Sequence, residues 1–587
     1  MNTIQKIAAL RTLMNQHGLA AYIVPGTDPH ASEYMASHWA EATWLSGFTG
    51  EACTLVVTTD RALLWTDSRY YLQAGIELKG TGIELMRESD IDCPSVIAWL
   101  SENVQGLVGV NPEMFSVDGY NELKKDLQVC SIDLVATLWT EGRPEIPMTP
   151  LYEYEERYAG ESVASKLQRV RKEIRAKKAD AMVISALDEI AWLLNIRGFD
   201  VDYNPVVIAY CILEQEKVTL FVNSRKVDAK AKAYFERIGV QMAEYEAVFE
   251  TLKKIDGTVL YDSAKVNERL YESIAGKSVA AKSPILIMKS HKNPVELDGE
   301  RRAMIQDSVA LTRFFMWLEQ QDIEKGGLTE WDLMEKLHSF RAMGEHFVEE
   351  SFGTIAGYRG NGAIVHYAAT AENCATIAGD GMLLLDSGGQ YLDGTTDITR
   401  CVWLGDNIPA EAKRDYTLTL KGHLALGHAR WPRGTRGNQL DALAKQYMWA
   451  AGITFGHGTG HGVGHFLGCH EGPQNVRTDM NPTVLEAGQI CSDEPGIYRT
   501  DKWGVRIENL VAVTPIAQTA ETTTEDEWLT WETLTLCYYD RRLMEMSMLT
   551  SKEITWLNDY HQRVYELTAP HLNAAEAAWL ADKCKVL

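Results

Sequence analysis

The sequence predicts an α/β (α+β) protein of several domains, and three observations carry this prediction. The chain has 587 residues, 45% of them hydrophobic and 24% charged, which is enough for two or three folded domains with separate cores. Short β-branched runs, such as residues 53–58, 206–210 and 217–222, alternate with stretches of helical spacing. In addition, one pattern of helix, strand and loop occurs twice.

The repeated pattern begins near residue 3 and again near residue 165. In each copy a helical apolar face precedes an apolar run, a loop containing an aspartate, and a Trp-Leu pair. Such a match, twice in the same order, indicates duplication of one α/β domain. In the first copy these are the helical face Ile4, Ile7 and Leu10, the run 20–25, Asp28 and Trp44-Leu45. In the second copy they are the helical face Leu167, Val170 and Ile174, the run 179–185, Asp188 and Trp192-Leu193.

Two segments have the composition of domain boundaries. Residues 143–150 are rich in proline, and residues 289–294 end in Asn293-Pro294. Asn293 is typical of a helix N-cap, Pro294 of a first helical position, and Glu296 of a capping acid. We therefore expect domains at residues 1–155, 156–290 and 291–587, with the third beginning on a long helix.

Charge and targeting signals exclude several classes of protein. Acidic residues outnumber basic ones by 81 to 57, and the net charge of -24 argues against nucleic acid or an anionic membrane as the main partner. No apolar h-region occurs near the start, and no run of about 18 apolar residues occurs anywhere, so we expect neither a secretory signal nor a membrane span. Ten scattered cysteines without a CxxC motif favour free thiols and a cytoplasmic location.

The first segment whose residues could form a catalytic or metal-binding site is 381–400. An apolar strand ends on Asp386, turns through Ser387-Gly388-Gly389, and returns through a threonine-rich strand with Asp397. An aspartate buried at the end of three leucines is unfavourable unless a positive group meets it. The alternative is that Asp386 simply caps the glycine turn.

The second segment is a histidine cluster. Four of the 15 histidines lie between residues 457 and 470, and glycine alternates from Gly456 to Gly464. Because glycine disfavours a helix, we expect an extended or looping backbone in which only some of the histidines reach a metal. A glycine-rich phosphate loop is the alternative, but the lysine of that motif is missing.

The third and fourth segments each carry a glutamate in or at the end of an apolar strand: Glu494 and Glu508. Either could be a structural ion-paired residue, and Arg506 could pair with Glu508 or with Asp386. Taken together, the carboxylates and a histidine form an oxygen-rich donor set that suits divalent metals, and four carboxylates could balance two ions. Cys469 and Cys491 are isolated, so no thiolate is expected among the ligands.

These motifs resemble those of the pita-bread metallopeptidases. Their order, and the length of the chain, are similar to the long three-domain cytosolic form of aminopeptidase P (Xaa-Pro aminopeptidase). The resemblance covers the whole chain and implies two creatinase-like N-terminal domains followed by a pita-bread catalytic domain, which would account for the duplication. The motifs are Asp386-Ser-Gly-Gly-Gln-Tyr-Leu-Asp-Gly-Thr-Thr-Asp397, Gly456-His-Gly-Thr-Gly-His461-Gly-Val-Gly464, Asp493-Glu-Pro-Gly-Ile-Tyr498 and Gly504-Val-Arg-Ile-Glu-Asn509.

The resemblance also implies a set of metal ligands. Asp386 would bind one ion, His461 and Glu494 mainly the other, and Asp397 and Glu508 would bridge them. The two ions are expected to be Mn²⁺, with Zn²⁺ or Co²⁺ as alternatives. Glu494 would also act as general base for a hydroxide that bridges the metals.

Further residues match the family's substrate contacts. His366, His457 and His470 would hold the peptide and stabilise the oxyanion, so they are both catalytic and substrate-binding. Arg69, in the first domain, would contact the substrate, and Arg506 would orient the metal-binding carboxylates. His465 has no counterpart in the family and is expected to be a bystander.

The implied activity is removal of the N-terminal residue from peptides with proline in the second position. An X-Pro bond has no N–H, so sites organised around that group would handle it poorly. The expected partners are short peptides and a second copy of the chain in a homodimer, with no nucleic acid and no membrane.

Four alternatives stand beside this interpretation. Prolidase shares the metal ligands but cuts only dipeptides and usually has one N-terminal domain. Methionine aminopeptidase lacks both N-terminal domains, and creatinase lacks the metal ligands. A non-catalytic peptide- or histone-binding protein on this fold would typically have lost the ligands, which are all present here.

Overall fold

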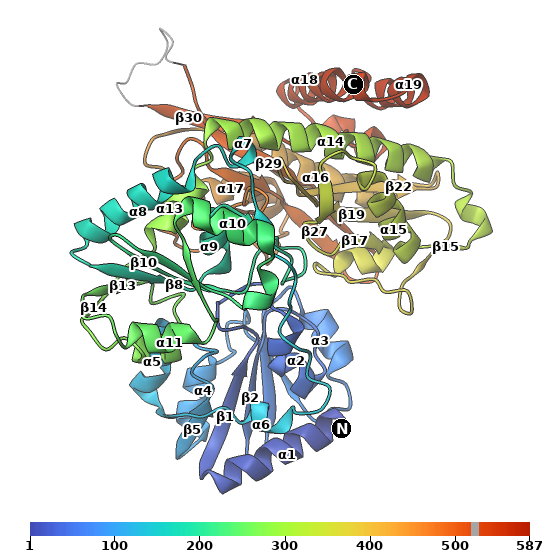
Figure 1. Cartoon of the computed structure of the whole chain (residues 1–587). Coiled ribbons are helices and arrows are strands. Elements are labelled where there is room, and N and C mark those ends of the chain that lie inside the picture. Colours follow the sequence, from blue (N-terminus) through green and yellow to red (C-terminus); the bar gives the residue numbers. More distant parts are fainter. Residues whose placement is uncertain (518–526) are drawn as a thin grey trace. The chain divides into compact units, whose positions relative to one another are not determined.

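The structure is a computed structural model that describes residues 1–517 and 527–587 (Figure 1). It divides into two compact units, Met1–Leu286 and Ile287–Leu587. Of the segment beyond residue 520, whose role the sequence leaves open, residues 521–526 lie outside the described residues. No helix within the described ranges is long and apolar enough to cross a membrane. All ten cysteines are free thiols, as predicted.

The first unit contains two six-stranded sheets. The strands of one are β1 (Leu19–Pro25), β2 (Thr54–Thr58), β3 (Ala62–Thr66), β4 (Glu84–Arg87), β5 (Leu107–Val110) and β6 (Gln128–Ser131). Those of the other are β8 (Ala181–Ile184), β10 (Tyr210–Glu214), β11 (Val218–Phe221), β12 (Gln241–Ala243), β13 (Val259–Tyr261) and β14 (Ser278–Ala280).

The two sheets have the same topology. Their orders are β4-β3-β2-β1-β5-β6 and β12-β11-β10-β8-β13-β14. In each sheet the first three strands in sequence order pair antiparallel and the remaining neighbours pair parallel. This confirms the duplication that the sequence predicts. The division of this unit at residue 155 stays a prediction.

Helix α1 (Thr3–Gln16) and helix α8 (Val163–Ala176) begin the two repeats. Side chains of Asn2 and Ser162 cap them, which satisfies backbone N–H groups of the first turn. Leu10 and Val170 are completely buried, as their spacing predicts. Ile4, expected on the same face as Leu10, is instead 58% exposed, so the buried stripe of α1 begins one turn later, at Ile7.

The second unit begins with the end of α13 (Pro284–Ser290) and with the long helix α14 (Pro294–Glu319). Asn293 and Glu296 form a capping box at the start of α14, as predicted. Helices α18 (Ser551–Thr568) and α19 (Ala574–Lys583) pack against α14 (Figure 1). The other long helices of this unit are α15 (Glu330–Arg341), α16 (Ala410–Gly427) and α17 (Gly437–Ala450).

Two antiparallel sheets and several hairpins carry the strand ends of interest. One sheet has the order β17-β19-β22 and the other β23-β30-β29-β26. Their strands are β17 (Ile355–Tyr358), β19 (Gly381–Ser387), β22 (Ile398–Leu404), β23 (Arg430–Pro432), β26 (Ile490–Asp493), β29 (Asn509–Pro515) and β30 (Trp528–Thr533). The hairpins pair β20 (Gly389–Tyr391) with β21 (Gly394–Thr395), β24 (Gly460–His461) with β25 (Asn475–Val476), and β27 (Gly496–Arg499) with β28 (Trp503–Arg506).

Strand β19 is buried on both faces. Leu383 and Leu385 pack in the core that α14 contributes to, while Met382 and Leu384 pack in the core that α16 and β28 contribute to. The alternation of a strand therefore turns Asp386 toward the same side as Leu384, into the interior of the unit.

The aromatic segment near the C-terminus belongs to the core as well, since Trp531, Tyr538 and Tyr539 are buried.

Candidate metal centre

Four carboxylates and two histidines meet at the strand ends of the second unit. Asp386 lies in β19, Asp397 directly before β22, Glu494 directly after β26, and Glu508 directly before β29. These residues form three overlapping groups of three. Within each group, one potential ligand atom from each residue lies within 4.8 Å of those of the other two. The groups are Asp386, Asp397 and Glu508; His461, Glu494 and Glu508; and Asp397, His461 and His470.

The donor set fits a pair of divalent ions. Asp386, Asp397 and Glu508 are 7%, 3% and 1% exposed, so water cannot solvate their charges. Asp386 Oδ1 and Glu508 Oε1 are buried and have no hydrogen-bond partner among the described residues. Buried carboxylate oxygens without a hydrogen-bond partner, in a group that also contains imidazole nitrogens, are donors that Mn, Fe, Co and Zn accept.

Glycines let the histidine loop lie directly against the carboxylates. A Cβ at Gly460 would come within 2.0 Å of the Ser492 carbonyl oxygen, so only glycine permits this contact between β24 and β26. The neighbouring His461 N–H donates to Ser492 Oγ at 3.0 Å. His461 Nε2 then lies 3.3 Å from Asp397 Oδ2 and 3.6 Å from Glu494 Oε1. The predicted looping backbone is confirmed, because residues 456–470 contain no helix.

Arg506 connects the carboxylates to one of the histidines. Its Nη2 donates to Asp386 Oδ2, and its Nε donates to Thr399 Oγ1 at 3.2 Å. Thr399 Oγ1 in turn donates to Glu508 Oε2 at 2.8 Å. Arg506 thus pairs directly with Asp386 and reaches Glu508 only through Thr399, which decides between the two partners that the sequence left open.

A second branch of this network leads to His457. Arg506 Nη1 donates to the Tyr498 hydroxyl at 2.8 Å. The same hydroxyl lies 2.7 Å from His457 Nε2. The arginine, tyrosine and histidine side chains therefore form one chain of hydrogen bonds that ends at Asp386.

Electrostatics at the site reflect crowded negative charge. Burial, together with the neighbouring carboxylates, raises the pKa of Glu508 well above its usual range. Burial also raises the pKa of Asp386 and of Glu494, although the charge of Arg506 opposes the rise at Asp386 and that of His461 at Glu494. At Asp397, burial opposes ionisation but the hydrogen bond and charge of His461 prevail, so its pKa is lowered. Positive charge placed among these groups would be strongly favoured.

The other predicted site residues lie in different surroundings. The ring of His470 is 4.3 Å from that of His461, centroid to centroid. His366 follows Val365, whose carbonyl accepts from Arg506 Nη2 at 3.4 Å. Arg69 lies in the first unit, where it pairs with Asp67 at 2.7 Å.

His465, the expected bystander, belongs to none of the three ligand groups and pairs with the buried Glu300, Nδ1 to Oε1, at 3.0 Å. This contact ties the histidine loop to α14.

Sequence reasoning did not foresee three contacts at the site. Tyr498 and Thr399 bridge the charged groups, although Tyr498 ends one of the quoted motifs and Thr399 lies in the segment 381–400. None of the three ligand groups contains a cysteine, in agreement with the sequence, but the buried Sγ of Cys469 lies 3.2 Å from Asp397 Oδ2. Cys469 and Asp397 are 72 positions apart in the chain, so only the folded loop reveals the contact.

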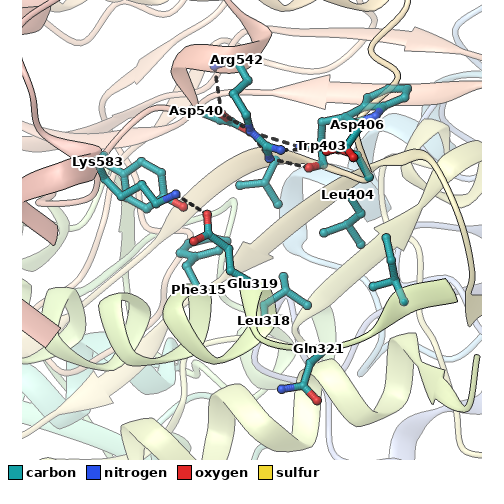
Figure 2. A pocket seen from close by; sticks show the side chains of 14 residues that line it. Phe315, Leu318, Glu319, Gln321, Trp403, Leu404, Asp406, Asp540, Arg542 and Lys583 are labelled. Carbon is teal, nitrogen blue, oxygen red and sulfur yellow. Dashed lines mark hydrogen bonds and ion pairs between the residues drawn. The ribbon is translucent and has the colours of Figure 1, made fainter. Parts of the chain in front are cut away.

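A pocket of about 200 Å³ lies elsewhere in the same unit, between α14 and β22 (Figure 2). Four of its charged side chains form two ion pairs, Lys583 with Glu319 and Arg542 with Asp540 (Figure 2). None of the residues lining it belongs to the three ligand groups.

Comparisons with known families match the chain from residue 6 to its end. Two models of the creatinase/prolidase N-terminal domain match residues 6–140 and 142–296. The model of metallopeptidase family M24 matches residues 298–515, and the model of the C-terminal region of that peptidase matches residues 527–587. The predicted fold class, two creatinase-like domains before a pita-bread peptidase domain, is thereby confirmed.

Individual relatives agree over nearly the whole chain. Xaa-Pro aminopeptidase 1 of Dictyostelium discoideum is 37% identical, covering 99% of this chain and 96% of the relative. Aminopeptidase P2 of Arabidopsis thaliana is also 37% identical, covering 99% and 88%.

Among solved structures, one is similar over the whole chain and another shares the fold over part of it. The X-prolyl aminopeptidase of Caenorhabditis elegans, described as a cytosolic enzyme with a di-nuclear active site, has a TM-score of 0.95 and 34% identity over 100% of both chains. A prolidase of Pyrococcus horikoshii has a TM-score of 0.51 and 21% identity, and it covers only 65% of this chain.

Proposed function

This chain belongs to the Xaa-Pro aminopeptidases of metallopeptidase family M24, and from that premise we propose that it removes the N-terminal residue from peptides with proline in second position. It is a metallo-aminopeptidase. One observation supports the location of the active site: the four carboxylates and His461 form overlapping groups whose ligand atoms lie within 4.8 Å of one another.

In this proposal, Asp386, Asp397, His461, Glu494 and Glu508 hold the metal ions. Two bound divalent ions would lower the pKa of a shared water so that a hydroxide forms near neutral pH, and would polarise the scissile carbonyl. Arg506 holds one oxygen of Asp386 and leaves the other, Oδ1, without a hydrogen bond and available as a ligand.

The carboxylate of Glu494 takes the proton from the nucleophile and returns it to the leaving nitrogen. Its position supports this role, because Glu494 belongs to a ligand group with His461 and Glu508 and its Oε1 lies 3.6 Å from His461 Nε2. Return of the proton matters for this substrate class, since the proline nitrogen has no N–H of its own and must be protonated to leave as an amine.

His366, His457 and His470 are proposed to bind the peptide and stabilise negative charge on the carbonyl oxygen as it develops. His457 is held by the Tyr498 hydroxyl, and His470 by its contact with His461. Arg69 is proposed to contact the substrate from the first unit.

The decisive experiment compares Xaa-Pro-Xaa tripeptides with Xaa-Pro dipeptides. Purified protein is loaded with Mn²⁺ and assayed for release of the first residue, before and after chelation. We expect turnover of the tripeptide that is lost on chelation and returns with Mn²⁺. A metal-loaded enzyme that leaves tripeptides intact but cuts dipeptides would instead be a prolidase.

Asp397→Ala tests the ligand set. The variant should remain folded but lose metal-dependent activity and bind less Mn²⁺ in calorimetry, because Asp397 belongs to two of the three ligand groups. Asp380→Ala, which removes an aspartate outside these groups, is the matched control. Activity retained by Asp397→Ala would contradict the ligand assignment.

We further propose that the native ions are Mn²⁺, that the protein is a homodimer and that it is located in the cytoplasm. Metal analysis of protein purified without added metal would test the first, and sedimentation equilibrium the second. Cell fractionation would test the third.

A further inference from the structure

We propose that Lys289 is a positioning residue for His470: through a buried ion pair with Glu471 it holds closed the loop that brings His470 to the metal ligands. This inference rests on the proposed function for the role of His470. It concerns a residue of α13 that lies outside the motifs of the site, and the argument begins with the shape of the loop.

Residues 462–471 fold back on themselves. The Glu471 N–H donates to the Gly462 carbonyl at 2.8 Å, and the Gly464 N–H donates to the Gly468 carbonyl at 2.9 Å. His461 and His470 flank these contacts, so closing the loop is what brings their rings to a centroid separation of 4.3 Å. The position of His470 thus depends on its neighbour Glu471.

The Glu471 side chain fastens the closed loop at two points. Its Oε1 accepts the Gly468 N–H at 3.1 Å, and its Oε2 accepts from Lys289 Nζ at 2.5 Å. A Cβ at Gly464 would lie 2.5 Å from Glu471 Oε1, so the glycine at this position makes room for the carboxylate. The loop is built around this one side chain.

The pair is almost sealed from water. The Lys289 and Glu471 side chains are 1% and 5% exposed. Removal of Lys289 breaks the only ion pair that Glu471 forms among the described residues; the buried Lys292 still attracts the carboxylate but does not replace this contact, so we expect Glu471 to move outward. That movement would weaken the bond to Gly468 and release His470.

The same unit contains a matched control. Lys421 pairs with Glu553 at 2.7 Å, with side chains that are 10% and 6% exposed. That pair joins α16 to α18 and does not touch the histidine loop. Lys421→Met therefore measures what the loss of a buried lysine does to stability alone.

The experiment uses full-length, Mn²⁺-loaded protein and two readouts: kinetics on an Xaa-Pro-Xaa tripeptide, and amide hydrogen exchange of the segment 462–473. Lys289→Met should raise exchange in this segment and lower kcat by about tenfold or more, with a change in KM of less than about threefold. Lys421→Met should change neither by more than about twofold. In Lys289→Met/Glu471→Gln, a neutral amide still accepts from Gly468, so both readouts should return toward wild type.

The proposal is overturned if folded Lys289→Met exchanges and turns over like wild type, or if Lys421→Met reproduces its effects. If Lys289→Met does not accumulate as folded protein, Glu471→Gln serves as the test, because it weakens the bond to Lys289 while keeping the acceptor for Gly468. Unchanged hydrogen exchange of segment 462–473 in Glu471→Gln would then refute the role of the Lys289–Glu471 pair. A wild-type enzyme that cuts no tripeptide would refute the proposed function instead, and the exchange comparison would still test the anchor.

Discussion

The buried His561 of α18 should make the second unit sensitive to acid. Its side chain is 0% exposed, and its Nε2 accepts the backbone N–H of Tyr539 at 3.1 Å, which requires an unprotonated nitrogen. Burial, together with the charges of Arg400 and Arg541, lowers the pKa of His561 from 6.5 to about 4. The imidazole is therefore neutral in the folded protein at any pH above that value.

The sign and size of the effect follow from linkage. Between pH 6.5 and 4 the unfolded chain binds a proton at this histidine and the folded chain does not. The contribution is thus fully present above pH 6.5 and is lost as the pH falls. At 1.36 kcal/mol per pKa unit, the loss is about 2 kcal/mol at pH 5 and about 3 kcal/mol near pH 4.

Urea unfolding at pH 7.5 and pH 5, with metal chelated, measures this loss. His561→Gln keeps an acceptor for the Tyr539 N–H but cannot be protonated, so its free energy of unfolding should fall by about 2 kcal/mol less than that of wild type over this range. His571→Gln, which replaces an exposed histidine, should follow wild type. Equal pH dependence in wild type and His561→Gln would refute the reasoning.

Two further predictions concern the site. Arg506→Lys should lower kcat/KM by roughly 30- to 100-fold, because a lysine cannot donate to Asp386, Thr399 and Tyr498 at once. An unchanged kcat/KM would show that these three hydrogen bonds of Arg506 are not needed for activity. Gly460→Ala should lower stability by about 1–3 kcal/mol and weaken Mn²⁺ binding in calorimetry, because its Cβ would overlap the Ser492 carbonyl. Gly452→Ala tests a glycine with positive φ and no such overlap, and it should leave metal binding intact.

Much of the fold could be predicted because local signals were strong. The capping box at Asn293 and the glycine-rich loop each depend on a few neighbouring residues, the duplicated pattern is carried by short segments in a fixed order, and all three appear in the structure. The error at Ile4 has the same origin, since periodicity defines a face but not where the neighbouring sheet begins to cover it.

The candidate site was predictable in composition but not in its connections. Acids at the ends of apolar strands are visible in sequence, and their residue types indicate a metal. The link from Arg506 through Tyr498 to His457, and the contact of Cys469 with Asp397, join residues whose spacing has no period. Such contacts depend on how separate hairpins dock, and no local pattern encodes that.

The arrangement of the ligands has a consequence for how the enzyme matures. Asp386 and Asp397 belong to the sheet of β17, β19 and β22, whereas Glu494 and Glu508 flank the strands β26 and β29 of another sheet. The pairs β19–β22 and β26–β29 form over short chain distances, but a full ligand set exists only after both sheets have docked, joining segments more than a hundred positions apart. During refolding, metal uptake should accordingly trail the recovery of secondary structure, and a nascent chain that ends before Glu508 would carry acids without a centre to hold an ion.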